Sequence, residues 1–420
     1  MREMKDSGIE WIGDIPVSWK IMPNKYLMRK EKKICPVYHG EDILSLTMKG
    51  VIVRDLDAGG KMPTSFDGYQ RLEAGNLLMC LFDIDVTPRC VGLIKQAGVS
   101  SPAYSQFVLR KGADAAYYCY YYTMLDNDKT LLHLAKNLRH SLTEDQLGAI
   151  PVIVPPIEEQ QRIADFLDTK CAEIDALTAD IQTQIDTLEQ YKRSVITETV
   201  TKGLDPDAEM KDSGIEWVGE IPAHWLVHPV YYYYGERKNK NYLGKEDNLL
   251  SLSYGRVVRK DINTSDGLLP ESFNTYNIVE TGDIIIRPTD LQNDKRSLRT
   301  GLVKEHGIIT SAYIDLCPIK QVDSRYFYFL LHAYDVMKVF YNMGNGVRQG
   351  LNYSEFSRLM VFEPPYDEQV AMADYLEAKV EEVDVVISDK KAQLATLDEY
   401  KKSLIFEYVT GKKEVSEGAD

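Results

Sequence analysis

Apolar residues recur at every seventh position in two long stretches of the chain, 157–202 and 366–413. The stripe of the first stretch comprises Leu167, Ile174, Ile181, Leu188 and Val195, and a second row comprises Ile163, Leu177 and Tyr191. The second stretch repeats this pattern with Leu376, Val383, Leu397 and Leu404 beside Met372, Val386 and Tyr400, although Lys390 breaks its stripe. A seven-residue apolar period is typical of helices that pair side by side. Because a proline pair precedes each stretch and a glycine follows it, the sequence predicts two long coiled-coil helices.

The two helical stretches belong to a repeat that spans the chain. Residues 4–16 read Met-Lys-Asp-Ser-Gly-Ile-Glu-Trp-Ile-Gly-Asp-Ile-Pro and return at 210–222 with only Ile-to-Val and Asp-to-Glu changes. Trp19 returns as Trp225 at the same offset. Self-similarity of this kind indicates two copies of one scaffold. The predicted organisation is block 1–156, helix 157–202, block 203–365, helix 366–413 and an acidic tail, 414–420.

Within the blocks, the pattern predicts buried strands and an aromatic helix. Glycine followed by an apolar run at 75–80 and at 282–286 predicts a turn that leads into a buried strand. The aromatic–aliphatic runs 117–122 and 326–331 are predicted to form mostly buried helices. Aromatic rings could instead stack on bases, but core packing is favoured because both copies carry such a run. Tyr231 to Tyr234 leaves the same two interpretations open.

Helix length predicts how the two helices run. About 45 helical residues at roughly 1.5 Å each span on the order of 65 Å. A compact block of roughly 160 residues has a radius of gyration of only about 15 Å. Because the block 203–365 joins the end of one helix to the start of the other, parallel helices would require it to bridge the whole length. The predicted fold is therefore α+β: two mixed α/β domains at opposite ends of an antiparallel pair of coiled-coil helices, in a pseudo-twofold tandem repeat.

The net charge of −15 over 420 residues seems unfavourable for a nucleic-acid partner until its distribution is considered. The two helical stretches and the tail together carry −12, whereas the blocks carry +1 and −4. A basic face on either block is therefore possible. The six cysteines form no CxxC pair, and neither a signal peptide nor a membrane-spanning run is found. The expected location is cytoplasmic, with reduced thiols and no membrane partner.

The sequence offers little catalytic chemistry. It contains no GxxxxGK[ST] loop for a nucleoside triphosphate and no HExxH pair for a metal, so no catalytic residue and no metal site is predicted. Glu363-Pro364-Pro365-Tyr366 is similar to the [Asn/Asp]-Pro-Pro-[Tyr/Phe] loop of adenine amino-methyltransferases. Its first residue is Glu, however, and the other copy reads Val154-Pro155-Pro156-Ile157. A helix start accounts for both copies, so this interpretation is favoured.

Clusters of basic and polar side chains occupy comparable places in both blocks and suggest DNA contacts. Arg, Gln and Asn read purine edges, and Lys and Arg bind phosphates. The candidate DNA-binding residues of the first block are Lys30, Lys32, Lys33, Arg89, Arg139 and His140. Those of the second block are Arg237, Lys238, Lys240, Lys295, Arg296, Arg299, Arg348, Gln349 and Asn352.

The repeated Lys-Asp-Ser-Gly-Ile-Glu-Trp-[Ile/Val]-Gly-[Asp/Glu]-Ile-Pro-x-x-Trp motif resembles the segment that opens each half of the specificity subunits of type I restriction–modification systems. The Pro-Pro-x-x-Glu-Gln segments at 155–160 and 364–369, each opening a helix that reaches Tyr-Lys-[Arg/Lys]-Ser, are similar to the same family. The resemblance covers essentially the whole chain.

This resemblance implies a non-catalytic subunit that recognises double-stranded DNA. Each block would read one half of a bipartite, asymmetric site, and the helices would set the spacer between the halves. The implied partners are two modification subunits and two restriction subunits. S-adenosylmethionine, ATP and magnesium are expected on those partners, and no cofactor is expected on this chain.

Two other functions are kept open. One is an adenine-specific DNA methyltransferase that uses the 363–366 segment, which requires methyl-donor binding by the chain alone. The other is a coiled-coil assembly protein without a DNA role, which requires no salt-dependent DNA affinity.

Overall fold

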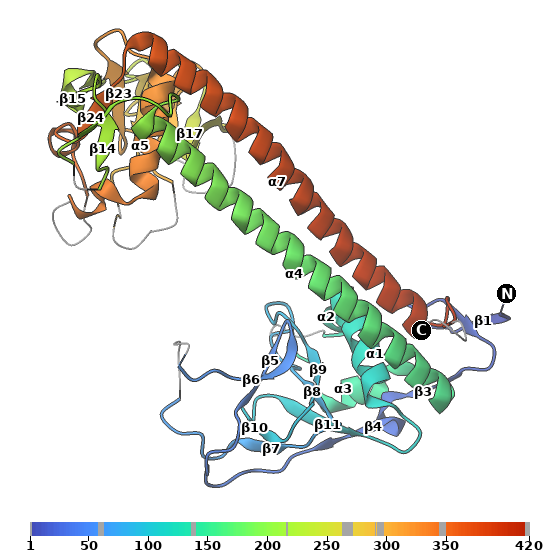
Figure 1. Cartoon of the computed structure of the whole chain (residues 1–420). Helices are drawn as coiled ribbons and strands as arrows, with labels where there is room; N and C mark the ends of the chain where they lie inside the picture. The colour runs from blue at the N-terminus through green and yellow to red at the C-terminus, as the bar shows by residue number, and fades with distance from the viewer. Residues whose placement is uncertain are drawn as a thin grey trace. The chain divides into compact units, whose positions relative to one another are not determined.

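A computed structural model of the chain describes residues 2–57, 63–135, 140–215, 217–262, 272–289, 291, 298–343 and 350–415. The chain divides into two compact units (Figure 1). The first unit comprises Met1–Ile181 and Ala392–Asp420, and the second comprises Gln182–Lys391. Each unit therefore holds one predicted block together with a part of both long helices.

The first unit is built around a four-stranded antiparallel sheet in the order β4(Met28–Glu31), β11(Ser105–Leu109), β8(Leu77–Met79), β9(Val91–Leu93). Further antiparallel pairs are β1(Met4–Asp6) with β2(Asp14–Pro16), β3(Lys20–Pro23) with β12(Pro151–Val154), β5(Leu44–Thr47) with β6(Gly50–Val53), and β7(Gln70–Leu72) with β10(Gly98–Ser100). The helices of the block are η1(Asn24–Tyr26), α1(Ala115–Asn127), α2(Thr130–Leu134) and α3(Glu144–Ala149).

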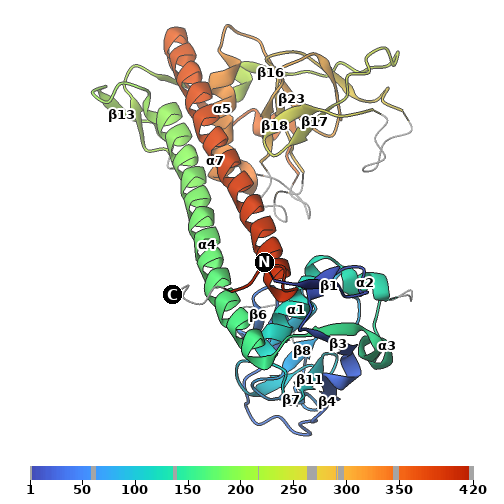
Figure 2. The ribbon, with the colours of Figure 1, turned by 90° about the vertical axis from the view of Figure 1, so that its right-hand side faces the viewer.

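Helix α1 lies beside the sheet and carries the tyrosine run into the core (Figure 2). The helix begins where the Asp114 side chain accepts a hydrogen bond from the Tyr117 amide. Tyr117, Tyr118, Tyr121 and Tyr122 are fully buried. Each hydroxyl donates to an interior acceptor; Tyr122, for example, donates to Asn24 Oδ1 at 2.6 Å. Core packing of this run, the favoured interpretation, is therefore correct for these four rings.

The second unit repeats the architecture strand for strand. Its four-stranded sheet has the order β16(Tyr234–Glu236), β23(Ile314–Pro318), β20(Ile284–Ile286), β21(Thr300–Leu302). Its antiparallel pairs are β13(Met210–Asp212) with β14(Glu220–Pro222), β15(Leu226–Pro229) with β24(Met360–Glu363), β17(Leu250–Ser253) with β18(Arg256–Arg259), and β19(Asn277–Val279) with β22(Gly307–Ile309). The helices of this block are η2(Val230–Tyr232), α5(Ser324–Val336), η3(Val339–Asn342) and α6(Tyr353–Phe356). Of the second tyrosine run, Tyr233 and Tyr234 are buried and Tyr231 and Tyr232 are exposed.

The long helices are α4(Ile157–Lys202), of 46 residues, and α7(Tyr366–Val409), of 44 residues. They run antiparallel within each unit. In the first unit, Phe166 packs against Tyr408 and Asp175 pairs with Lys401, so a higher number on α4 meets a lower one on α7. In the second unit, Gln184 contacts Lys390 and Lys192 pairs with Asp384 in the same descending order.

The buried stripe of α4 does not keep the predicted seven-residue period. Leu167, Ile174 and Ile181 are buried as predicted, but the later buried positions include Ile185, Ile196 and Val200. The prediction that a second row of apolar residues is buried is wrong at several positions. The exposed side chains are those of Leu177, Tyr191, Val386 and Tyr400. A straight helix drifts by about 20° per heptad, so its buried face moves away from a strict heptad after a few turns. None of the described helices combines the length and apolar character needed to cross a membrane.

Candidate nucleic-acid interface

The repeated opening motif joins the ends of the two long helices. Trp19 is fully buried, and its Nε1 donates to Glu159 Oε2 at 2.9 Å in the first turn of α4. Gly411, which follows α7, lies so close that an added Cβ would be 2.8 Å from the Trp19 ring. The second copy repeats this contact: Trp225 Nε1 donates to Glu368 Oε2 at 3.0 Å. The motif therefore has a structural role, in which one tryptophan fastens the start of one helix to the end of the other.

The candidate cations of the first block are mostly engaged in contacts within the chain. Lys33 Nζ lies 2.5 Å from Glu73, and Lys30 Nζ lies 3.8 Å from Glu144. Arg89 is largely covered and donates to Asn127 Oδ1 at 2.8 Å. His140 Nδ1 lies 2.9 Å from Asp85, and this hydrogen bond lowers the pKa of Asp85. Lys32 is exposed, with no ion pair within the described part of the chain.

In the second block, Arg237 supports the fold. Its Nε and NH2 donate to the two oxygens of Asp283 at 2.7 and 3.0 Å, and the Asp283 side chain has an exposed fraction of only 1%. Lys240 donates to Thr275 O, and burial lowers its pKa. Lys238, in contrast, keeps 70% of its side chain exposed beside Glu236.

Strand register decides which of these cations correspond. Met28 pairs with Leu109 and Tyr234 pairs with Pro318, which aligns Lys32 with Lys238. By the same alignment, Glu31 of the first block and Arg237 of the second occupy equivalent positions. The clusters therefore coincide at the exposed Lys32 and Lys238, but not residue for residue as the sequence suggested.

Arg299 is a correction to the predicted set. Its side chain is fully buried, its Nε donates to the Tyr341 hydroxyl at 2.9 Å, and its backbone N–H donates to Asp335. Burial raises the pKa of Tyr341 to about 12. A guanidinium without exposed surface cannot reach a base or a phosphate, so Arg299 organises the core of the second block instead.

Five candidates lie outside the described residues: Arg139, Arg348, Gln349, Lys295 and Arg296. They stay predictions. Asn352 is exposed, but its side chain caps α6 by accepting from the Glu355 amide at 3.0 Å. The capping box that it forms with Glu355 gives it a local structural role.

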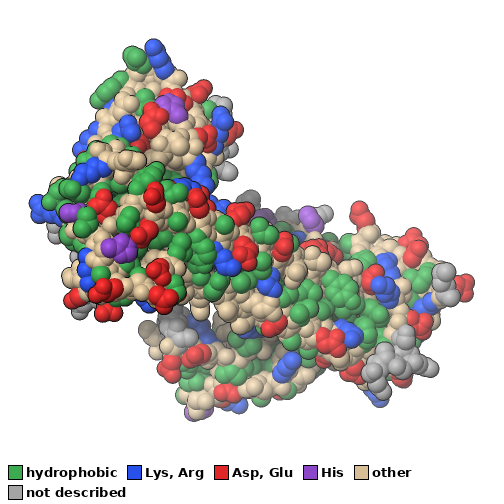
Figure 3. Space-filling model, turned by 45° about the horizontal axis from the view of Figure 1, so that its top comes forward, with side chains coloured by type: hydrophobic (Ala, Val, Ile, Leu, Met, Phe, Trp, Pro, Cys, Tyr) green, Lys and Arg blue, Asp and Glu red, His purple; other side chains and the backbone are tan. Residues whose placement is uncertain are grey.

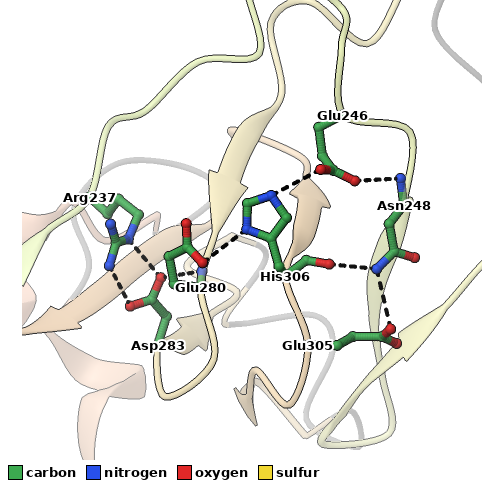
Figure 4. A network of polar contacts seen from close by, with 7 residues as sticks. All are labelled: Arg237, Glu246, Asn248, Glu280, Asp283, Glu305 and His306. Carbon is green, nitrogen blue, oxygen red and sulfur yellow. Dashed lines mark hydrogen bonds and ion pairs between the residues drawn. The ribbon is translucent and has the colours of Figure 1, made fainter.

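A polar network links the segment before β17 to the β19–β22 ribbon (Figure 4). His306 lies between Glu246 and Glu280, with each nitrogen 2.9 Å from a carboxylate oxygen. The hydrogen bond that the His306 ring makes to the Glu280 carboxylate raises the pKa of His306. Asn248 donates to His306 O at 2.6 Å and to Glu305 at 3.3 Å. These contacts hold the surface segment in place. No cluster of metal-ligating side chains occurs among the described residues.

The hairpin β17–β18 carries residues that the sequence did not single out. Tyr254, in its turn, is 87% exposed, and Arg256 NH2 lies 2.5 Å from Asp384 of α7. The other copy has Met48 and Gly50 at these positions. Aligning the hairpins of the two halves would have marked both positions as unlike. On the face shown in Figure 3, Lys and Arg side chains are interspersed with Asp and Glu, so this face presents no single basic patch.

The Glu363–Tyr366 segment is a junction between β24 and α7. Glu363 accepts a hydrogen bond from the Tyr233 hydroxyl at 2.7 Å, and Pro364 O accepts one from Gln369 at 2.9 Å. In the first copy, Gln160 donates to Pro155 O at 2.8 Å in the same way. The shared geometry supports a helix start in both copies.

Comparison with known proteins shows which proteins the chain resembles. Residues 91–187 match the type I restriction modification DNA specificity domain. Two relatives from Methanocaldococcus jannaschii are specificity subunits of type I restriction enzymes: MjaX, a provisional assignment, is 24% identical over 65% of this chain, and MjaVIII is 25% identical over 63%. The chain is therefore similar to specificity subunits of type I restriction enzymes. The matches span 61% and 62% of the lengths of these two relatives, which is less than two thirds of either.

A solved structure shares the fold of this chain. It comes from work on complex assembly and conformational transition of the type I restriction–modification system. The two structures align with a TM-score of 0.69 over 95% of this chain and 99% of that chain. At 12% sequence identity, this likeness establishes a shared fold and no individual contact.

Proposed function

We propose that this chain is the DNA-specificity subunit of a type I restriction–modification complex and catalyses no reaction itself. Each block reads one half of a bipartite, asymmetric DNA site. The helices α4 and α7 set the spacer and dock the modification subunits. The placement of the blocks at opposite ends of the helical pair, which the sequence predicts, is part of this proposal.

The observation that carries the proposal is one scaffold present twice with unlike surfaces. Both sheets have the same strand order, yet Glu31 stands where the other copy has Arg237, and Gly50 where it has Arg256. A protein that reads two different half-sites needs a common framework to place both readers and different side chains to contact different bases. The two copies meet both needs.

Partners supply the chemistry in this proposal. Two modification subunits hold S-adenosylmethionine and methylate adenine, and two restriction subunits use ATP and magnesium. Lys32 and Lys238 are the described candidates best placed for phosphate contact, because they are exposed and occupy matching positions. Arg139, Arg348 and Gln349 are the proposed base-reading residues.

The test is a genome-wide map of adenine methylation in cells that express the chain with its modification subunit. A split motif with two unlike halves and a fixed spacer should be present, and deleting the chain should remove it. Replacing block 1–156 with the corresponding block of another family member should change one half only. Identical methylation with and without the chain, while the modification subunit is active, would refute the proposal.

A further inference from the structure

The first unit contains a groove that lies between its block and its helices. Its volume is about 740 Å³, and it is lined by the turn of β5–β6, by β9, and by faces of α1, α4 and α7. The walls include the half-buried apolar side chains of Val51, Leu93, Leu394 and Leu397. Met48, at the rim, is 61% exposed. A concave surface of this size, with both apolar and charged walls, fits several side chains of an amphipathic protein segment.

The internal repeat shows how the same position is closed in the second unit. Asp175 and Asp384 are equivalent, and each pairs with a lysine of the other long helix, Lys401 at 2.5 Å and Lys192 at 2.6 Å. In the second unit, Asp384 is also 2.5 Å from Arg256 of the hairpin. In the first unit the equivalent hairpin position is Gly50, which has no side chain to reach Asp175.

A second difference between the two copies also leaves room in the groove of the first unit. In the second unit, the hydroxyl of Tyr328 on α5 donates to Gly255 O at 3.1 Å and so joins the hairpin turn to the helix. The equivalent position on α1 is Cys119, which lines the groove. Among the described residues, the side chains of Arg256 and Tyr328 therefore occupy in the second unit the positions at which Gly50 and Cys119 line the groove of the first.

The charges that line the groove select the kind of occupant. Two of its three carboxylates pair with lysines, Asp175 with Lys401 and Asp398 with Lys402 at 2.8 Å, whereas Asp168 accepts from the neutral Tyr120 hydroxyl at 2.7 Å. Lys49 and Lys95 are exposed at the rim and form no ion pair with any described residue. The charge left over is positive, and an acidic segment would complement it.

We propose that this groove docks an acidic, amphipathic segment of the modification subunit, and that the second unit offers no equivalent groove. The inference rests on the proposed function, which places modification subunits on α4 and α7, and the groove is continuous with these helices. Partly apolar walls that also carry three carboxylates suit a protein segment better than a phosphate backbone, which is bound through many cations. The two copies of the modification subunit therefore bind with unequal affinity.

The experiment is a titration of the purified chain with the modification subunit, in which native mass spectrometry counts bound copies at each concentration. Wild type should bind two copies with separate dissociation constants. Lys95→Glu should weaken the tighter step by about fivefold or more, because it repels the acidic segment. Its matched control is Lys304→Glu, since Lys304 is the exposed equivalent of Lys95 in the second unit, and it should change neither step by more than about twofold.

A filling variant tests shape independently of charge. Cys119→Tyr copies the residue of the second unit and should weaken the same step, whereas Cys119→Ser should not. Equal effects of Lys95→Glu and Lys304→Glu, or no effect of Lys95→Glu and Cys119→Tyr in a folded protein, would overturn the inference. If the variants lower DNA affinity instead, the groove contacts nucleic acid and the inference is wrong. If wild type binds no modification subunit, the proposed function itself fails.

Discussion

Replacing Asp315 with asparagine should stabilise the second unit at neutral and alkaline pH. Asp315 lies in the central strand β23 with a relative exposure of 1%, and neither carboxylate oxygen has a hydrogen-bond partner within the described part of the chain. Burial raises its pKa from 3.8 to about 8, and the charge of Asp283 adds to the effect while Arg237 opposes it. The unfolded chain, in contrast, ionises near the ordinary value.

The magnitude follows from the difference between the two pKa values. Because the folded pKa is raised, the contribution of Asp315 to stability is fully present below pH 3.8 and is lost as the pH rises to about 8. Each pKa unit corresponds to about 1.4 kcal/mol, so the loss at pH 7 is on the order of 4 kcal/mol. A buried asparagine without partners costs about 1–3 kcal/mol. Asp315→Asn should therefore be roughly neutral near pH 4.5 and stabilising by on the order of 2 kcal/mol at pH 8.

The assay is urea denaturation of wild type and variant from pH 4.5 to 8.5, with hydrogen exchange of β20 and β23 to assign the change to the second unit. Gln106 offers the reciprocal control, because it is the equivalent residue of β11 and is fully buried with its amide bonded to Arg71 O. Gln106→Glu should destabilise the first unit increasingly as the pH rises. A stability difference between wild type and Asp315→Asn that stays constant over this pH range would refute the reasoning.

Three further predictions concern the packing of Gly307, the contact of Trp225 and the binding of DNA. Gly307→Ala should destabilise the second unit by about 1–3 kcal/mol, measured by denaturation, because its Cβ would lie 2.5 Å from the backbone oxygen of Asn248, which cannot move cheaply; a wild-type midpoint would contradict this packing. Trp225→Ala should lower the free energy of unfolding by about 3–5 kcal/mol and speed hydrogen exchange in the first turn of α7, because a fully buried ring that is hydrogen-bonded to Glu368 is lost. Unchanged protection of that turn would show that Trp225 does not hold it in place. Lys238→Ala should weaken binding to all DNA sequences about equally and reduce the slope of log affinity against log salt concentration by about one, whereas Arg348→Ala should cost roughly 1–3 kcal/mol of binding free energy and relax specificity at one base position. For either residue, unchanged affinity and specificity in a binding titration would exclude it from the interface.

Local sequence determined much of this protein by itself. The proline pairs and the glycines Gly203 and Gly411 marked the ends of α4 and α7, because proline fits only a first turn and glycine adopts the left-handed conformation that ends a helix. The tyrosines of α1 were assigned to the core because both copies place aromatic and aliphatic residues there. The repeat revealed two copies of one fold, and the same strand order in both sheets agrees with it.

Only the tertiary structure decided which polar residues are available to a ligand. Trp19 meets Glu159, and Arg237 meets Asp283, across long separations that no local pattern encodes. Arg299 is a residue type that binds DNA, yet it is buried against Asp335 and Tyr341, because it directly precedes β21, which packs against α5. Likewise, only the fold shows that Arg256 reaches Asp384 in the second unit. Gly50, at the equivalent position of the first unit, has no side chain to reach Asp175, and both residues line the groove. The sequence does not distinguish a solvated charged side chain from a paired one, because the partner lies far away in the sequence and only the tertiary structure brings the two together.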